Sequence, residues 1–243
     1  MDGFLHWWAG VGNAVADWFT DFGDTFHRCF IEESRYMLFV RGIWMTILIS
    51  IVSALLGMVI GLLIAGCSLS KKKWLNRIGK IYTDVIRGTP SVTQLMIIYF
   101  VVFKNIFWPK WLIASIAFAI NSGAYVSEII RAGILSIDKG QTEAGRSLGL
   151  SGFQTMRHIV IPQAVKNIFP AMCNEFITLI KETAIVGYVG LIDINKAGDF
   201  IKSNTYEAFM PLIGTAIIYF VLIKALTLVL GKIEAHLRKS DYR

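Results

Sequence analysis

The stretch Ile43–Cys67, IWMTILISIVSALLGMVIGLLIAGC, contains no charged side chain. A helix needs about 20 mostly apolar residues to cross the ~30 Å hydrocarbon core of a bilayer, so this stretch predicts a membrane-spanning helix. The whole chain of 243 residues agrees, because 55% of it is hydrophobic and only 17% is charged, against about 25% charged in soluble domains. We therefore expect a membrane protein, and this composition excludes a disordered tail, a disulfide scaffold and a soluble enzyme.

Four further apolar stretches complete a prediction of five spans in an all-α transmembrane protein. They cover Arg87 to Lys104 with a start as early as Ile81, Trp111 to Glu128, about Ile168 to Leu191, and about Ala208 to Gly231. The fourth carries Glu175, Lys181 and Glu182, and the fifth carries Lys224 near its end. Glu128 and Arg131, at the end of the third, have the spacing of a structural ion pair on a helix.

Lysine and arginine in the connections indicate which side of the membrane each connection occupies. With five spans, one side carries six of them in residues 68–90, four in 134–166 and four after residue 231, whereas the other side carries seven. Since positive residues favour the cytoplasmic side, the amino terminus is predicted outside the cell and the carboxyl terminus in the cytoplasm. The basic pI of about 9.3 then reflects this orientation, and we expect no nucleic-acid partner.

The first 41 residues do not form a secretory signal, because Asp2 stands at the usually positive start and no apolar core follows. Apolar side chains recur there every three or four residues: Phe4, Trp8, Val11, Val15, Trp18, Phe22 and Phe26. We expect residues 1–41 to form an external amphipathic helix on the membrane surface, with docking to a partner as the alternative. Residues 42–232 are predicted to form the transmembrane domain, and residues 233–243 a cytoplasmic tail.

The sequence lacks the motifs of catalysis and metal binding. Its three cysteines have no C-x-x-C spacing and its four histidines form no H-E-x-x-H. The nearest approach to a phosphate-binding loop, Gly61 to Gly66, has no following lysine. We therefore predict no catalytic residue, no metal site and no cofactor on this chain, and we expect that it is not an enzyme.

The connection between the third and fourth predicted spans, about residues 134–165, is too long for a turn. Its pattern predicts two short helices broken around Gly149–Gly152, with apolar positions that include Leu148 and Phe153. Such a cytoplasmic knob could insert into a groove on a partner. An amphipathic loop that lies on the membrane surface without a partner explains the pattern equally well.

The same connection resembles a known family signature. Glu143-Ala144-Gly145, three residues, Gly149, nine residues and Ile159-Val160-Ile161-Pro162 are similar to the EAA motif of ATP-binding-cassette (ABC) importer permeases. Gly145 replaces the second alanine of that motif, and Ile161 replaces a leucine. Five further stretches resemble the polar amino acid uptake branch: Arg87-Gly88-Thr89-Pro90 with Gln94, Ala124-Tyr125 with Glu128-Ile129-Ile130-Arg131-Ala132-Gly133, Pro162-Gln163-Ala164, Asn174-Glu175-Phe176, and Lys181-Glu182-Thr183.

The resemblance covers about residues 40–230 and implies a five-helix type I importer permease fold in a bacterial cell membrane. It implies that 134–165 is a coupling loop for a separate ATPase subunit, with Glu143, Ala144, Gly145, Gly149, Ile159 and Pro162 at the contact. It also implies a second permease subunit, identical or related, an extracytoplasmic amino-acid-binding protein and a polar or basic amino acid as substrate. ATP and magnesium would belong to the ATPase. The alternative is a secondary transporter or channel subunit that works without an ATPase.

Glu175 and Glu182 are seven residues apart, so on a helix they lie about 20° apart around the axis, with Thr178 between them. A charged side chain at bilayer depth costs about 2.5–3.5 kcal/mol on insertion scales and marks a functional site by default. In one interpretation the two carboxylates pair with Lys181 or Arg131 of another helix or subunit, or are protonated, and only fix the packing. In the other, which we favour, Glu175, Thr178 and Glu182 line the substrate passage and receive a cationic group.

Overall fold

The computed structural model of the chain describes residues 17–238, and these residues form helices and connections without any strand. Residues 17–26 are helical. The elements that follow, with short π- and 3-10-helical turns marked η, are η1 (His27–Ile31), η2 (Glu32–Ser34), α2 (Tyr36–Ser68), α3 (Lys73–Arg87), α4 (Ser91–Ile97), η3 (Ile98–Val102), α5 (Lys110–Leu135), α6 (Lys139–Ser147), α7 (Gly152–Thr155), η4 (Met156–Val160), α8 (Ile161–Glu182), η5 (Thr183–Val189), α9 (Ile194–Thr205) and α10 (Phe209–Arg238). The predicted all-α fold is confirmed.

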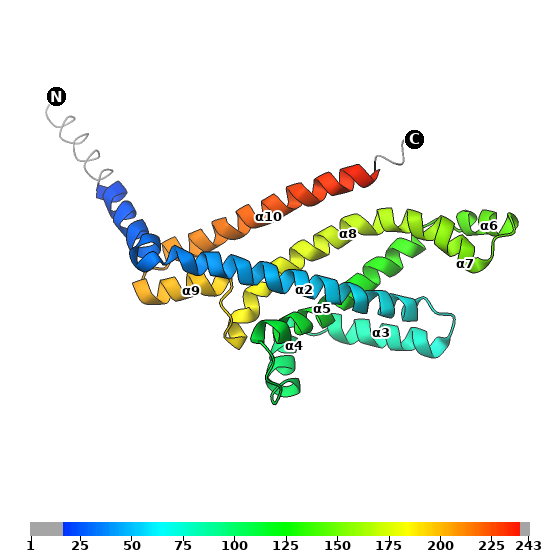
Figure 1. The fold of residues 1–243 in the computed structure, drawn as a ribbon, viewed down its shortest axis with the longest axis horizontal. Helices are drawn as coiled ribbons and strands as arrows, with labels where there is room; N and C mark the ends of the chain where they lie inside the picture. Colours follow the sequence, from blue (N-terminus) through cyan, green and yellow to red (C-terminus); the bar gives the residue numbers. More distant parts are fainter. Residues whose placement is uncertain (1–16, 239–243) are drawn as a thin grey trace, which may run out of the picture.

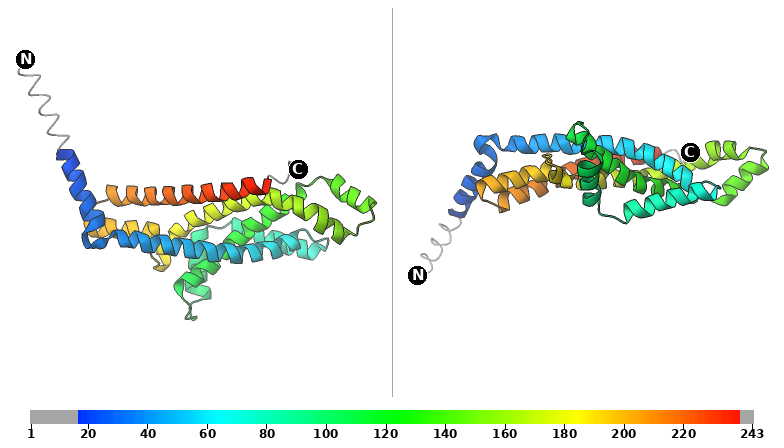
Figure 2. Two further views of the ribbon diagram at one scale, coloured as in Figure 1. Left: turned by 45° about the horizontal axis from the view of Figure 1, so that its top comes forward. Right: turned by 90° about the horizontal axis from the view of Figure 1, so that it is seen from below.

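The molecule is elongated, and its long helices follow its long axis (Figure 1). The start of α2 lies beside α9 at one end. At the other end α6 and α7 project beyond the loop that joins α2 to α3 (Figures 1 and 2). The first end corresponds to the side predicted as external, and the second to the side predicted as cytoplasmic. The orientation in a membrane stays a prediction.

Helix α5 is the most buried of the long apolar helices. In the most apolar 18-residue segment of α5, 72% of the residues are buried. In the corresponding segments of α2 and α10, 28% and 6% are buried. It packs closely along α2, where a side chain added at Gly61 would collide with Val126. The Ser53 hydroxyl also donates to the Ser115 carbonyl at 3.1 Å. Small residues therefore bring the two helices into direct contact, as is common between membrane helices.

Three helices of the described chain, α2, α5 and α10, are long and apolar enough to cross a membrane. A bent pair, α3 with α4 and η3, makes a fourth candidate. The predicted fourth span corresponds largely to α8, which is not among these candidates. The count of five spans stays a prediction.

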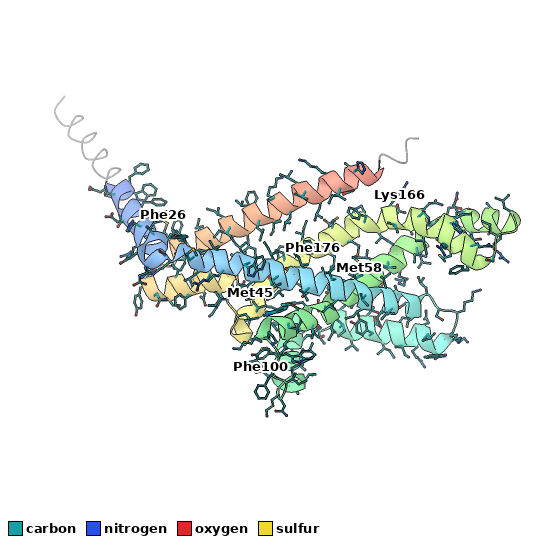
Figure 3. The ribbon with its side chains drawn as sticks, in the orientation of Figure 1. Phe26, Met45, Met58, Phe100, Lys166 and Phe176 are labelled. Carbon is teal, nitrogen blue, oxygen red and sulfur yellow. The ribbon has the colours of Figure 1, made fainter. Side chains whose placement is uncertain are left out.

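The second predicted span is not one straight helix. It begins earlier, at Lys73, and bends by 102° between α3 and α4. Pro90 explains the break, because proline has no N–H for a helical hydrogen bond and disfavours a helical residue before it. The second half leaves the bundle as an arm, on which Phe100 is 49% exposed (Figure 3). The prediction of one span over 87–104 is therefore corrected.

The fourth predicted span, 168–191, also differs from the structure. The helix begins earlier, at Ile161, and ends at Glu182. A 3-10 turn follows, and Gly190 reverses the local backbone with φ +73°. The sequence did not indicate that α8 ends at Glu182, because the turn that follows, Thr183–Val189, is itself apolar. Helix α9 then continues toward the end of the molecule where α2 begins (Figure 1).

The predicted domain boundaries fall inside helices. Helix α2 begins at Tyr36, before the boundary predicted at 41, and α10 continues to Arg238, past the boundary predicted at 232. In the described part of the amino-terminal segment, Trp18 is 59% and Phe22 is 40% exposed. Residues 1–16, which carry the first half of the predicted amphipathic stripe, lie outside the described residues. The position of this segment on the membrane surface stays a prediction.

Candidate coupling helices and substrate passage

The segment predicted as a coupling loop is a pair of helices with well-defined ends. The Asp138 side chain begins α6 by accepting a hydrogen bond from the Gly140 amide at 2.6 Å. Ser151 begins α7 with a reciprocal capping box: its hydroxyl accepts from the Gln154 amide, and the Gln154 side chain accepts from the Ser151 amide. These caps satisfy amide groups that a helix leaves unpaired at its start. The break at 148–151 confirms the predicted helix pair.

Gly149 makes the turn between the two helices. Its φ of +84° lies in the left-handed region, where a side chain costs about 1–2 kcal/mol. The Gly149 amide donates to the Arg146 carbonyl at 3.0 Å, and the Leu150 amide donates to the Gly145 carbonyl at 3.2 Å. This pair of bonds is the Schellman arrangement that ends a helix. The Arg146 guanidinium also donates to the Leu150 carbonyl at 2.9 Å, and this side-chain hydrogen bond stabilises the turn.

Packing explains why Gly145 stands where the EAA motif has its second alanine. This glycine is buried, and a Cβ there would lie 2.8 Å from both Ile159 Cδ1 and Thr155 Cγ2. Real side chains avoid such a distance, so an alanine here would push η4 away from α6. The structure therefore brings Gly145 and Ile159 of the motif together as the contact between the two short helices.

The other motif residues face outward. Glu143, Ala144 and Pro162 are exposed. Two large apolar side chains at the same end, Leu148 and Phe153, are 81% and 72% exposed. A rigid, capped helix pair that exposes large apolar residues has the form of a knob for a groove on another protein.

Helix α8 carries the predicted passage residues. Glu175 is half-buried and accepts a hydrogen bond from the Ser122 hydroxyl of α5 at 2.7 Å. Thr178 is exposed and Glu182 is half-buried. Within residues 17–238, the Glu182 side chain takes part in no hydrogen bond and no ion pair. Together with exposed Lys181, these residues form a polar stripe on the surface of a single chain.

Arg131 does not pair with the α8 carboxylates. Its Nε donates to Glu128 Oε1 at 3.0 Å and its Nη2 donates to Oε2 at 2.8 Å, which confirms the predicted ion pair. Elsewhere on α5, the Tyr125 ring lies 5.2 Å from the Arg87 guanidinium carbon, within cation–π range. Within this chain, the interpretation that pairs Glu175 with Arg131 is therefore wrong.

A buried amide pair at the α3–α4 bend is a feature that sequence reasoning missed. The Gln94 amide donates to the carbonyls of Ile86, at 2.7 Å, and Thr89, at 3.1 Å, so it satisfies acceptors that the bend leaves free. Asn121 of α5 donates to the Gln94 carbonyl oxygen at 2.9 Å. The four-residue gap between Pro90 and Gln94 was the available signal, because it places the glutamine one turn after the break.

A second missed feature is Asp193, which is fully buried. Its carboxylate accepts from the backbone amides of Asn195 and Lys196 at the start of α9, at 2.9 and 3.0 Å, and from the Tyr219 hydroxyl of α10 at 3.1 Å. Gly42 of α2 touches the Asp193 backbone so closely that a Cβ would come within 2.7 Å. Burial raises the pKa of Asp193 above its usual range.

The sequence of this chain matches a known family of transport proteins. Residues 57–239 match the family described as the binding-protein-dependent transport system inner membrane component. The chain belongs to this family. The match confirms the predicted ABC importer permease and its location in the bacterial inner membrane. Since the relatives are permease subunits whose ATPase is a separate chain, this permease is a transport subunit and not an enzyme.

Named relatives cover most of the permease. It is 41% identical to the putative glutamine transport system permease protein GlnP of Rickettsia bellii, over 85% of this chain and 96% of that protein. It is 42% identical to the arginine transport system permease protein ArtQ of Bacillus subtilis, over 83% and 93%. A crystal structure of an amino acid ABC transporter with histidines matches with a TM-score of 0.78 and 41% identity, over 85% and 98%. These matches confirm the type I importer permease fold.

Proposed function

We propose that this permease forms half of the membrane passage of an ATP-driven importer for a polar or basic amino acid. The α6–α7 pair receives the motion of a separate ATPase, and the polar stripe of α8 lines the path of the substrate. No chemistry occurs on the substrate. ATP and magnesium belong to the ATPase, and an external binding protein delivers the amino acid.

The observation that carries this proposal is the exposed apolar tip of the α6–α7 pair. Residues 17–238 leave Phe153 and Leu148 uncovered, yet the helices that carry them are capped and are joined by the tight turn at Gly149. Without a partner, such a tip would leave apolar surface in water at about 25 cal/mol per Å². A groove on the ATPase is the cover that the family implies. Glu143, exposed on the same helix pair, would add a charged contact at its rim.

A second permease subunit would complete the passage. In one chain the stripe of Thr178, Lys181 and Glu182 is open to its surroundings, and polar groups at bilayer depth face protein or a water-filled cavity rather than lipid. Two such stripes face to face would enclose a polar path. The subunit can be identical or related.

Two kinds of observation support the substrate class. The relatives are named for glutamine and arginine transport, and the solved transporter contains histidines. In this chain, Glu182 is a half-buried carboxylate with no side-chain partner among the described residues, so it can receive the ammonium group that all amino acids share. Glu175, held by Ser122, would supply a second acceptor for a polar or cationic side chain.

The decisive test replaces Phe153, an apolar residue at the exposed tip of the α6–α7 pair. In the complete transporter, we expect Phe153→Asp to abolish co-purification of the ATPase and ATP-driven uptake into proteoliposomes, because a carboxylate cannot enter an apolar groove without a large desolvation cost. Tyr206→Asp is the matched control: Tyr206 is 96% exposed near the opposite end of the molecule, and aspartate tolerates its left-handed backbone.

Two results would contradict the proposal. An ATPase that remains bound to Phe153→Asp would show that this tip is not the contact. Gradient-driven uptake by the permease without ATPase would instead support the secondary transporter.

A further inference from the structure

Helix α3 carries two parallel stripes on its exposed side that neither the coupling nor the passage uses. Trp74, Ile78, Ile81 and Val85 are 50–61% exposed and recur every three or four residues, so they form one apolar stripe. Lys73, Arg77 and Lys80 each precede one of the first three of these residues, and all are exposed. They form a basic stripe directly beside the apolar one.

The opposite side of α3 fixes this orientation. Gly79 packs so tightly against Ser68 of α2 that no side chain fits there, and Thr83 is buried. The Tyr82 hydroxyl donates to the Ile120 carbonyl of α5 at 2.6 Å. Since these contacts hold one face of α3 on the bundle, the basic and apolar stripes must face outward.

The three cations of the basic stripe have no partner in the described chain. Within residues 17–238, no carboxylate lies in ion-pair range of Lys73, Arg77 or Lys80. Their side chains and those of Trp74, Asn76 and Ile81 line a surface groove of about 730 Å³. Lys71 and Lys72, also exposed, precede these residues in the chain and add two positive charges to this segment. The groove thus joins several free cations to an indole and an aliphatic wall.

We propose that this groove binds the headgroup of an anionic phospholipid, such as phosphatidylglycerol, in the cytoplasmic leaflet. The phosphate would lie among the cations, the acyl chains along Ile78, Ile81 and Val85, and Trp74 at the boundary, where tryptophan is enriched in membrane proteins. Lysine and arginine stems reach along apolar surface while their charges stay with the headgroups. This site goes beyond the proposed transport function and does not depend on which substrate is carried.

A lipid fits this surface better than the ATPase does. The coupling helices α6 and α7 project past the start of α3 (Figures 1 and 2), so an ATPase seated on them meets the tip of the molecule and not its side. A soluble subunit would also have to cover an apolar stripe that continues along α3 to Val85. A phospholipid supplies both the negative charge and the hydrocarbon.

The test compares three triple variants of the complete transporter in nanodiscs. Electron paramagnetic resonance of spin-labelled lipids gives the preference for phosphatidylglycerol over phosphatidylcholine at the protein surface. In Lys73→Gln/Arg77→Gln/Lys80→Gln we expect this preference to fall at least about fivefold, the contribution of a single basic residue near an anionic surface. Lys73→Arg/Arg77→Lys/Lys80→Arg should keep it. So should Arg41→Gln/Lys104→Gln/Lys110→Gln, which removes three exposed cations away from α3.

Several outcomes would overturn the site. Wild type could show no preference, or the two glutamine triple variants could lose it equally, which would indicate general attraction by net charge. If Lys73→Gln/Arg77→Gln/Lys80→Gln releases the ATPase or the second permease while its lipid preference is unchanged, the groove binds protein instead. If that variant fails to assemble, the salt dependence of the wild-type lipid preference is measured instead. Raising the salt concentration from about 0.05 to 0.5 M shortens the electrostatic screening length to a few ångströms, and this must weaken the preference for phosphatidylglycerol.

Discussion

At the scale of single residues, the informative positions are those whose polarity conflicts with their surroundings. Glu175 and Glu182 lie on one helix, yet their environments differ: the first accepts a hydrogen bond from Ser122, whereas the second has no side-chain partner in the described chain. A carboxylate already satisfied by its own fold suits a structural or orienting role. One without a partner at this depth is available to a ligand. Glu182 is therefore the residue on which substrate affinity should depend most.

Replacing Glu182 tests this directly. Glu182→Gln keeps the shape and removes the charge, so we expect uptake at low substrate concentration to fall about tenfold or more, the loss of one hydrogen bond to a charged group. The insertion of the permease in the membrane should not fall. The measurement is ATP-driven uptake by the reconstituted transporter across substrate concentrations.

Glu207→Gln provides the control. This change keeps the oxygen that accepts from the Phe209 amide, and it lies beyond α9, away from the α8 stripe. Uptake by Glu182→Gln that equals wild type at every substrate concentration would remove this residue from the passage.

At the scale of elements, the sequence predicts helices well where local chemistry determines them. Apolar runs identify α2, α5 and α10, and the glycines around 149–152 locate the break between α6 and α7. The predictions fail where tertiary contacts decide. The bend after α3 is held by Gln94 and Asn121 from two different helices, and α8 ends within an apolar run whose hydropathy gives no stop signal. The candidate site followed the same division. The family motif indicates which residues to expect at the coupling contact, whereas nothing in the sequence indicated that Ser122 is the partner of Glu175.

Gly149 offers a test at this scale. No atom lies within 4 Å of a Cβ added there, so Gly149→Ala changes only the backbone preference, by about 1–2 kcal/mol. We expect amide hydrogens near the carboxyl end of α6 to exchange about fivefold faster or more, because the Schellman bonds open more often. Gly152→Ala is the matched control: its added Cβ is equally free, but it lies in the first turn of α7, where alanine suits the helix. Equal exchange in both variants would contradict the role of the turn.

At the scale of the whole molecule, Asp193 joins the end where α2 begins to the rest of the permease. Its carboxylate caps α9 and accepts from Tyr219 of α10, and its backbone touches Gly42 of α2, so three elements meet at this residue. Asp199 on the same helix is the opposite case: it is largely solvated, and hydrogen bonds from Lys202 and then Lys196 lower its pKa below the usual range. The two groups should give stability of opposite pH dependence.

The sign follows from proton binding. Because burial raises the pKa of Asp193, the folded state binds more protons than the unfolded state above pH 3.8, and the free energy of unfolding falls as pH rises through the folded pKa. Asp193→Asn keeps an acceptor for the α9 amides and removes this dependence, so its melting temperature relative to wild type should rise from pH 4 to 7. For Asp199→Asn the relative melting temperature should fall slightly as pH rises from about 3 to 5, because only wild type gains its lysine contacts. Thermal unfolding in nanodiscs measures both, and a relative melting temperature of Asp193→Asn that is flat or falls from pH 4 to 7 would show that burial does not raise the pKa of Asp193.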